Sequence, residues 1–308
     1  MPIAIIVHGG AGSISADRFE TAQAGCKEAA LAGWRVLQAG GSALDAVEAA
    51  VRSLEDNPNY NAGTGACLTS DGNIELDAGI MEGQNLSVGA VAGVERIKNP
   101  ISLARKVLES PHVLLVGQGA QEFAQEQGIS LCQLDDLKTA RQYNLWLKRR
   151  EAQAAQEEPR YVRREFNPPV TDEERHGTVG AVAVDSAGVL AAATSTGGIH
   201  NKHHGRVGDS PLVGCGFYAD ENAAISCTGD GEDFTRLLIA KRAADVVARG
   251  ATARNAAEAA IAILTARATG TGGLIVVDRL GNVGFAKNSE NLAYAFLMEG
   301  QQEPVAGV

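Results

Sequence analysis

The sequence predicts an α+β protein in which two layers of β-sheet form the core and helices cover them. Both halves of the 308-residue chain begin with short apolar runs that are typical of buried strands. Each half also contains longer segments in which apolar residues recur at helical spacing. Because a sheet and a helix each have an apolar face to bury, strands and helices in both halves favour sheets packed between helices around a shared core.

The N-terminal segments predict a strand followed by two helices. Residues 2–7, PIAIIV, form a continuous apolar run that predicts a buried strand. Residues 16–39 predict a helix. Its apolar face would consist of Ala22, Cys26, Ala29, Gly33 and Val36. Ser42, with Asp45 three residues later, resembles an acidic capping box and predicts a second helix that runs to about Glu55.

The next segments predict further strands and then helices. Residues 67–77 contain two apolar runs around a Ser-Asp-Gly-Asn turn, a pattern that predicts a β-hairpin. Residues 87–94 predict another strand. From residue 101 to about residue 155 the pattern is helical, in two or three pieces.

After residue 177 the pattern returns to strands and then to helices. The predicted strands are residues 179–184, 190–196, 223–228, 273–278 and 283–286, and the predicted helices are 232–249 and 252–267. The first two strands are joined by Asp185-Ser-Ala-Gly188, which predicts a hairpin. We expect the last two strands to end the ordered chain.

Composition and charge limit the classes of partner and compartment. The net charge of −10 argues against a nucleic-acid partner, which needs a basic face. No apolar run approaches the ~18 residues that a membrane-spanning helix needs. The start, MPIAIIVHGG, lacks the basic segment of a signal peptide, so we expect a cytoplasmic protein. Five irregularly spaced cysteines without a CxxC pair predict reduced, mostly buried thiols.

A charged, proline-interrupted segment separates the two halves. Residues 150–175 lose apolar periodicity, and Pro159, Pro168 and Pro169 interrupt them. We predict a flexible linker at about 152–177. A structureless segment of this length inside a compact protein indicates either a functional loop or a processing site.

Thr178 opens a strand directly after this linker. Taken alone, a threonine at that place is ordinary strand composition. Gly177, however, leaves the preceding peptide bond unhindered, and the linker would let the chain be cut there without disturbing packed elements. A cut before Thr178 would create an N-terminal threonine whose own α-amine, with a pKa near ~8, can act as the base for its hydroxyl.

Two further loops carry polar side chains whose role the residues alone leave open. Thr194-Ser-Thr-Gly-Gly198 could be a simple turn, but the predicted hairpin would return Thr196 to the start of the Thr178 strand. Arg206 and Asp209 lie in the glycine-rich loop GRVGDSP. They could form a salt bridge in an exposed loop, or they could bind the carboxylate and ammonium of an α-amino acid.

The segment Cys227-Thr-Gly-Asp-Gly-Glu232 lies between a predicted strand and a predicted helix. It lacks the Lys-Ser/Thr pair of a phosphate-binding P-loop, which argues against a nucleotide site. Its backbone N–H groups and the Thr228 hydroxyl could instead stabilise an oxyanion or a carboxylate. Asn61 could be a turn residue or a side chain that fixes the reaction centre.

The histidines give only a weak indication of a metal site. His200, His203 and His204 lie close in the sequence, but no cysteine or carboxylate pair stands at metal-ligand spacing, so we expect a solvated loop. His8 is expected to be a buried structural histidine.

Taken in order, these motifs resemble one known family. HGTVGAVAVD, TSTGG, GRVGDSP and CTGDGE, together with HGGAG, YNAGTGA and ELDAGIMEG in the first half, are similar to the plant-type L-asparaginase / isoaspartyl aminopeptidase family of N-terminal-nucleophile hydrolases. Each motif is short, but their common order and spacing are specific. The resemblance covers nearly the whole chain apart from the linker and the last dozen residues.

The resemblance implies a single αββα sandwich over residues 1–308, made as an inactive precursor. Thr178 would attack the Gly177 carbonyl, and self-cleavage at this Gly177–Thr178 site would leave an α subunit (1–177) and a β subunit (178–308). The mature enzyme would hydrolyse L-asparagine and β-aspartyl (isoaspartyl) dipeptides to L-aspartate through a β-aspartyl-threonine ester. The family assembles as an (αβ)₂ heterotetramer.

The resemblance also implies roles for individual residues. Thr178 would be the nucleophile with Thr196 beside it and Asn61 holding it, and Thr228 with the Gly229 N–H would form the oxyanion hole. Arg206 would bind the substrate α-carboxylate, Asp209 its α-ammonium, and Gly229 and Gly231 would help to bind substrate. Catalysis would need no cofactor, but a structural sodium ion is expected. Its backbone ligands would be Leu54, Glu55, Asn57, Tyr60, Ala62 and Thr64.

Three other functions remain to be separated from this one. A glycosylasparaginase would use the same chemistry on glycan-linked asparagine, but is expected to carry a signal peptide and disulfides. A bacterial-type asparaginase would act as a single uncut chain of a different fold. A non-enzymatic metal- or nucleotide-binding protein would depend on the histidine cluster and on CTGDGE alone.

Overall fold

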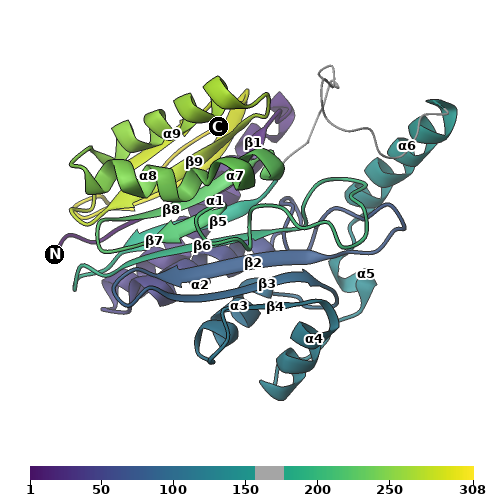
Figure 1. The fold of residues 1–308 in the computed structure, drawn as a ribbon, viewed down its shortest axis with the longest axis horizontal. Coiled ribbons are helices and arrows are strands. Elements are labelled where there is room, and N and C mark those ends of the chain that lie inside the picture. Colours follow the sequence, from purple (N-terminus) through teal and green to yellow (C-terminus); the bar gives the residue numbers. More distant parts are fainter. Residues whose placement is uncertain (157–176) are drawn as a thin grey trace.

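In the computed structural model, which describes residues 1–156 and 177–308, the strands form two β-sheets (Figure 1). The strands of the larger sheet are β1 (Ala4–Gly12), β2 (Leu76–Glu82), β3 (Ser87–Val94), β4 (Leu114–Val116), β5 (Val179–Val184), β6 (Leu190–Thr196), β11 (Asn291–Met298) and β12 (Val305–Gly307). Those of the smaller sheet are β7 (Phe217–Ala219), β8 (Ala223–Gly229), β9 (Gly272–Asp278) and β10 (Val283–Lys287). The mixed α+β class is therefore confirmed.

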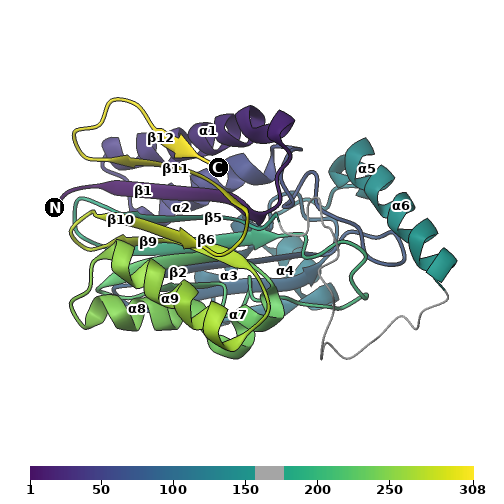
Figure 2. The same ribbon diagram turned by 90° about the horizontal axis from the view of Figure 1, so that it is seen from above.

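Helices cover the outer faces of the two sheets (Figures 1 and 2). They are α1 (Phe19–Gln38), α2 (Ala43–Glu55), α3 (Pro100–Leu108), α4 (Gly117–Glu126), α5 (Leu134–Leu137), α6 (Ala140–Gln156), α7 (Gly231–Leu237), α8 (Ile239–Ala248) and α9 (Ala253–Arg267), with a short 3₁₀ turn at Ala16–Arg18. Helices α1, α2 and α3 pack on the larger sheet, and α8 and α9 pack on the smaller one.

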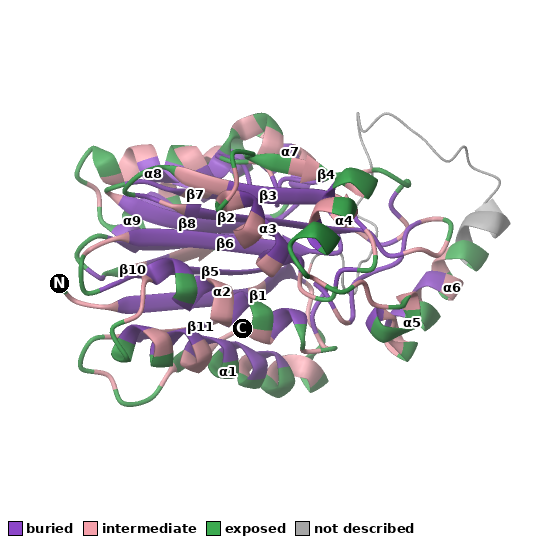
Figure 3. Ribbon diagram, turned by 90° about the horizontal axis from the view of Figure 1, so that it is seen from below, coloured by how far each residue is buried: buried purple, intermediate pink, exposed green. Residues whose placement is uncertain are grey.

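The two sheets face each other because their central strands are apolar on both sides. In β1, Ile5 and Val7 point into the core beneath α1 and α2, whereas Ala4 and Ile6 belong to the cluster between the sheets. Strand β9 alternates in the same way, with Leu274 under the C-terminal helices. Successive side chains of a strand point to opposite faces, so a continuous apolar run fills two cores at once. Figure 3 shows β1 buried along most of its length.

The larger sheet contains strands from both sides of residue 177, and β1 lies between two strands that follow it. Its strand order is β12-β11-β1-β5-β6-β2-β3-β4, and that of the smaller sheet is β10-β9-β8-β7. Strand β5 begins at Val179 and pairs antiparallel with β1 on one side and β6 on the other. The residue that precedes β5 is therefore held near the middle of the sheet, and the predicted 179–196 hairpin is confirmed.

Several of the predicted helices and strands are confirmed, and others differ from the prediction. Ser42 accepts a hydrogen bond from the Asp45 N–H at 3.1 Å, which confirms the predicted helix start. The predicted helix at 232–249 is broken, because Leu238 takes a left-handed conformation (φ 53°) between α7 and α8. The sequence analysis also missed strands β4, β7, β11 and β12. Strand β11 pairs with β1, so the two ends of the described chain meet in one sheet.

The predicted hairpin at 67–77 is wrong. Its turn forms, since the Thr69 N–H donates to the Asn73 carbonyl at 2.9 Å. The flanking residues form no ladder with each other, however, and β2 starts only at Leu76 and pairs with β3 and β6. The residues before it contact distant segments instead: the Ser70 N–H donates to the Lys202 carbonyl at 2.8 Å.

The region before residue 177 differs in detail from the prediction. The helical stretch from residue 101 consists of α3 to α6 with the short strand β4 between them. Helix α6 continues to Gln156, so residues 150–156 are helical rather than part of a linker. The remainder of the predicted linker, residues 157–176, lies outside the described residues. No helix in the described ranges is long and apolar enough to cross a membrane.

Phe217 gives a test of the packing between the sheets. Its ring is fully buried and occupies the space over Gly79, where a Cβ atom would approach the ring to 2.1 Å. We expect Phe217→Ala to lower the free energy of unfolding by about 3–5 kcal/mol, because the cavity cannot close between two sheets. Denaturant unfolding followed by circular dichroism measures this, with the exposed Leu280→Ala as the control. Equal stability of the two variants would contradict this packing argument.

Candidate active site

Two threonine hydroxyls meet at the start of β5 and the end of β6. Because Val179 pairs with Ser195 in the antiparallel register, Thr178 and Thr196 are neighbours across the two strands. The Thr178 hydroxyl donates to the Thr196 Oγ1 at 3.1 Å. The Thr196 Oγ1 also accepts the Gly198 N–H at 2.9 Å. The proximity that the hairpin predicts is thus confirmed, and both side chains are buried.

These hydroxyls lie in a small pocket that also contains charged side chains. The lining residues come from the β5 start, the β6 end, the following loop and the β8–α7 junction. They are Thr178, Thr196, Gly198, Ile199, Arg206, Gly208, Asp209, Ser210, Gly229 and Gly231. The structure therefore brings together the predicted nucleophile and both members of the predicted clamp.

Arg206 is held by a partner that the sequence analysis missed. Its Nε and Nη2 atoms donate to the two carboxylate oxygens of Glu232 at 3.1 and 2.8 Å. The alternative of an exposed Arg206–Asp209 salt bridge is wrong, since the Arg206 side chain is only 15% exposed and its ion pair is with Glu232. Its Nη1 atom remains on the side of Gly198 and Gly208, two residues that line the pocket.

Asp209 has a buried carboxylate, one oxygen of which accepts no hydrogen bond from the described residues. Its residue exposure is 4%, and its Oδ2 has no hydrogen-bond partner among the described residues. Burial raises the pKa of Asp209 to about 7, although the Arg206 charge opposes this rise. Buried polar atoms in folded proteins are generally satisfied, so an unpartnered carboxylate oxygen facing a pocket suits a cationic ligand group.

Thr228 is the second-last residue of β8 and directly precedes Gly229. Its Oγ1 accepts the Ala11 N–H at 3.2 Å, a contact that the irregular pairing of β1 after His8 makes possible. With this lone pair occupied, the hydroxyl hydrogen can point toward a ligand. Gly229 has φ 153°, and a Cβ atom there would lie 2.5 Å from the Thr271 carbonyl oxygen, so only glycine fits. Ala11 lies in the HGGAG motif, but that motif alone did not indicate its contact with Thr228.

Asp230 and Gly231 continue this strand-to-helix junction. The Asp230 carboxylate accepts the Thr271 N–H at 2.8 Å, so it braces the neighbouring loop. A Cβ atom at Gly231 would lie 2.9 Å from the Asp209 Oδ1 and 3.1 Å from the Arg206 Nη2. The absence of a side chain at Gly231 therefore keeps the space beside both charges open.

Asn61 fixes the loop that follows β6. Its amide Nδ2 donates to the Gly198 carbonyl at 2.6 Å, and its Oδ1 accepts the Cys67 N–H at 2.8 Å. Its backbone carbonyl accepts the Gly197 N–H at 2.9 Å. A Cβ atom at Gly177 would lie 2.6 Å from the Asn61 Cβ. Asn61 thus touches the residue before Thr178 as well as the glycines after Thr196.

Residues 54–64, which contain the expected sodium ligands, fold back against the end of helix α2. The Glu55 carbonyl accepts the Thr64 N–H at 2.8 Å, and the Asn57 carbonyl accepts the Tyr60 N–H at 3.2 Å. At Gly63, which has φ 50°, a Cβ atom would lie 2.6 Å from the Glu55 carbonyl oxygen and 2.8 Å from that of Lys98. Glycine at residue 63 therefore lets the loop pass close to two backbone carbonyl oxygens.

The Glu55 side chain connects this loop to strand β6. It is fully buried, and its Oε1 accepts the Ser195 hydroxyl at 2.7 Å and the Ile101 N–H at 3.0 Å. Burial raises the pKa of Glu55 to about 8, although these hydrogen bonds oppose the rise. Ser195 is the residue before Thr196, so Glu55 hydrogen-bonds next to the β6 end.

The solvated loop expected for the neighbouring histidines is confirmed for His203 and His204 but wrong for His200, which is buried. His8 is buried, as predicted, and its Nε2 lies 2.9 Å from the Ser226 Oγ. His204 is exposed, but its ligand atom lies within 4.8 Å of those of Glu75 and Glu95. The sequence analysis missed these carboxylates because they come from segments more than a hundred residues away. Glu75 already pairs with His204 at 2.5 Å and accepts the Gly205 N–H at 3.0 Å.

The cysteines are free thiols, as predicted, and Cys132 is the one among them that is not fully buried.

Comparison with known proteins places this pocket in context. The model of a protein family described as asparaginase matches residues 1–306. The chain is 49% identical over 310 residues to the plant-type L-asparaginase of Thermococcus kodakarensis, covering 99% of each chain. It is also 49% identical to the plant-type L-asparaginase of Pyrococcus abyssi, covering 99% of this chain and all of that one. It is 42% identical to the human isoaspartyl peptidase/L-asparaginase, covering 97% of this chain and 94% of the human one.

Proposed function

This chain belongs to the asparaginase family, and from that premise we propose that it is a self-cleaving amidohydrolase that converts L-asparagine and β-aspartyl dipeptides to L-aspartate. The observation that carries the proposal is the pocket in which two threonine hydroxyls face a guanidinium and an unpartnered buried carboxylate. Both substrate classes present a free α-carboxylate and a free α-ammonium, which Arg206 and Asp209 complement.

Maturation begins at the Gly177–Thr178 bond. The Thr178 Oγ attacks the Gly177 carbonyl carbon, the C–N bond breaks, and the acyl group moves from nitrogen to oxygen. Water then hydrolyses this ester, which leaves a Gly177 carboxylate and a free Thr178 α-amine. The tight approach of Gly177 to Asn61 supports a requirement for glycine before the nucleophile. The products are an α subunit (1–177) and a β subunit (178–308), which together form the four-layer αββα sandwich.

The mature enzyme uses the same hydroxyl on the substrate. The Thr178 α-amine accepts the proton of the Thr178 Oγ, which attacks the side-chain carbonyl carbon of the substrate. The Thr228 hydroxyl and the Gly229 N–H stabilise the oxyanion. The leaving ammonia or amine takes up the proton as the C–N bond breaks, and a β-aspartyl ester remains. Water hydrolyses the ester and releases L-aspartate.

The surrounding residues orient the substrate and the nucleophile. Arg206 binds the α-carboxylate through the atoms that Glu232 leaves on the pocket side, and Asp209 binds the α-ammonium. Thr196 keeps the Thr178 hydroxyl in place, and Asn61 holds the loop between Thr196 and Arg206. A structural sodium ion in the 54–64 loop would support this arrangement, and two copies would assemble as (αβ)₂ in the cytoplasm. No cofactor takes part in catalysis.

The direct test is the intact mass of the purified protein under denaturing conditions, with N-terminal sequencing of any fragment. We expect two fragments, the smaller beginning Thr-Val-Gly-Ala at residue 178. One stable mass of 32.0 kDa together with asparaginase activity would indicate the bacterial-type enzyme instead. Assays with L-asparagine, a β-aspartyl dipeptide and N-glycosylated asparagine separate the proposed activity from that of a glycosylasparaginase.

The raised pKa of Asp209 predicts a pH dependence of ligand binding. The carboxyl must be ionised to hold an ammonium, and its pKa of about 7 means that its ionised fraction falls as pH falls through 7. We therefore expect the product L-aspartate to bind about tenfold more weakly at pH 6 than at pH 8. Calorimetric titration measures this. Succinate, which lacks the ammonium, is the control, and an equal pH dependence for both ligands would contradict the assignment.

A further inference from the structure

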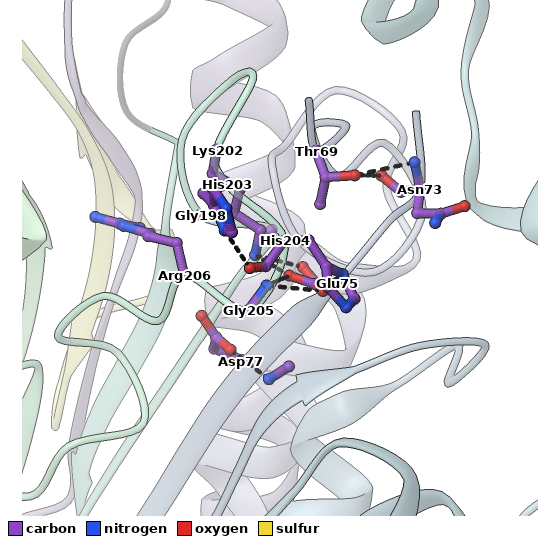
Figure 4. Close-up of polar contacts among 12 residues, drawn as sticks. Thr69, Asn73, Glu75, Asp77, Gly198, Lys202, His203, His204, Gly205 and Arg206 are labelled. Atoms are coloured by element: carbon purple, nitrogen blue, oxygen red, sulfur yellow. Dashed lines mark hydrogen bonds and ion pairs between the residues drawn. The ribbon is translucent and has the colours of Figure 1, made fainter. Parts of the chain in front are cut away.

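A second buried cation lies directly behind the pocket, and neither the motifs nor the mechanism above uses it. The side chain of Lys202 is 0% exposed. Its Nζ donates to the Glu75 backbone carbonyl at 2.9 Å, whereas the nearest Glu75 carboxylate oxygen is 3.9 Å away. Figure 4 shows this side chain beside Gly198 and Glu75. Fully burying an ammonium is costly, so its position indicates that the charge has a role.

Only a glycine separates this ammonium from the pocket. A Cβ atom at Gly198 would lie 3.2 Å from the Lys202 Nζ and 3.4 Å from the Arg206 Nη1. Gly198 lines the pocket beside Thr196 and Arg206. Two positive groups therefore converge on one glycine in the pocket wall, and no side chain intervenes.

Two buried carboxylates, those of Glu75 and Asp77, interact with the Lys202 charge. The Glu75 carboxylate is 2% exposed and accepts the Gly205 N–H, so its negative charge is shared with a group other than Lys202. Burial raises the pKa of Asp77, and the positive charge of Lys202 opposes this rise. Charges at such separations interact strongly where water is excluded.

We propose that Lys202 is a positioning residue that strengthens the hold of the substrate α-carboxylate at Arg206 by adding positive potential through Gly198. This inference rests on the proposed function and extends it to a specificity determinant. A second cation next to a single-carboxylate site favours substrates with a free, charged α-carboxylate over those in which the carboxylate is amidated or buried in a peptide bond.

The test compares two substrates that differ only in this charge. L-Asparagine carries the α-carboxylate, and L-asparaginamide carries an uncharged carboxamide in its place. We expect Lys202→Met to raise the KM of L-asparagine about tenfold and to change the KM of L-asparaginamide by less than about twofold. Lys202→Arg, which keeps the charge, should retain most of the wild-type preference. Lys106→Met removes an exposed lysine on α3 and is the matched control.

The outcomes separate a charge effect from a structural one. An equal loss for both substrates in Lys202→Met would show that the side chain only supports the loop, and would overturn the proposal. Lys202→Gln is also neutral but keeps a hydrogen-bond donor for the Glu75 carbonyl. It replaces Lys202→Met in the test if the methionine variant does not fold. If neither neutral variant undergoes self-cleavage while Lys202→Arg does, the charge acts on maturation and the proposal is also wrong.

A failure of the proposed function gives a different result. Wild-type protein that hydrolyses neither asparagine nor a β-aspartyl dipeptide would refute the function but not the charge argument. Calorimetric binding of L-aspartate and of its α-amide to the wild type and to Lys202→Met then tests Lys202 alone. A preference for L-aspartate that survives the substitution unchanged would overturn the inference.

Discussion

Thr178→Ala is expected to yield a folded, uncut chain of 32.0 kDa without detectable hydrolysis of L-asparagine. The substitution removes the hydroxyl that we propose attacks both the Gly177 carbonyl and the substrate. It deletes only the end of a side chain that hydrogen-bonds to Thr196, so the sheet around it should be preserved. Loss of a nucleophile lowers turnover by roughly 10⁴-fold or more. Intact mass, circular dichroism and an ammonia-release assay measure the three parts of this result.

Thr178→Ser is the matched control for this variant. It keeps a hydroxyl and a future α-amine at the same place, so it should still cut and should keep measurable activity. Val179→Ala alters the next residue of β5 without touching the chemistry, and it should cut like the wild type. A Thr178→Ala chain that still separates into fragments starting at residue 178 would refute Thr178 as the nucleophile.

Arg206→Ala is expected to lower kcat/KM for β-aspartyl dipeptides by about 10²–10³-fold, mainly through KM. Truncating one partner of a desolvated, hydrogen-bonded charge pair costs about 2–5 kcal/mol. The substrate carboxylate would lose the cationic partner proposed for it, and Asp209 would lose a charge that opposes its protonation. Steady-state kinetics at pH 8 measure the effect under conditions in which Asp209 is mostly ionised.

Arg236→Ala is the matched control for Arg206→Ala. Arg236 lies on α7 near Glu232, but its side chain is 71% exposed and pairs with Asp233. An exposed ion pair contributes little, so this variant should stay within about twofold of the wild type. If Arg206→Ala gave the same KM as Arg236→Ala on both substrate classes, Arg206 would not bind the α-carboxylate.

Glu232→Gln tests the residue that holds Arg206. The amide preserves the shape of the side chain but removes one of the two charge-assisted contacts to the guanidinium. We expect a rise in KM of about threefold to tenfold, smaller than that for Arg206→Ala because the cation itself remains. Kinetics on L-asparagine measure it, and a rise larger than that of Arg206→Ala would mean that Glu232 itself contacts substrate.

Local sequence patterns predicted the structure correctly in segments whose conformation depends mainly on their own residues. The apolar runs at residues 179–184 and 190–196 and the turn between them predicted the hairpin, because the turn residues and the alternation of the strands agree. This hairpin alone brings Thr178 and Thr196 together. The helix start at Ser42 followed from the capping pattern for the same reason. Local signals failed at residues 67–75, which form the predicted turn but no ladder between its flanks, because Ser70 bonds to the distant Lys202.

The sequence by itself determined the α+β class, the β5–β6 hairpin and the motifs that contribute Thr178, Arg206, Asp209 and Thr228. Only the tertiary structure decided which partners surround them. Glu232 reaches Arg206 from the next helix, Ala11 reaches Thr228 from the first strand, and Lys202 reaches Gly198 from across the loop. Such contacts join residues that share no periodic pattern, and their energies come from burial and charge that exist only once the two sheets have packed.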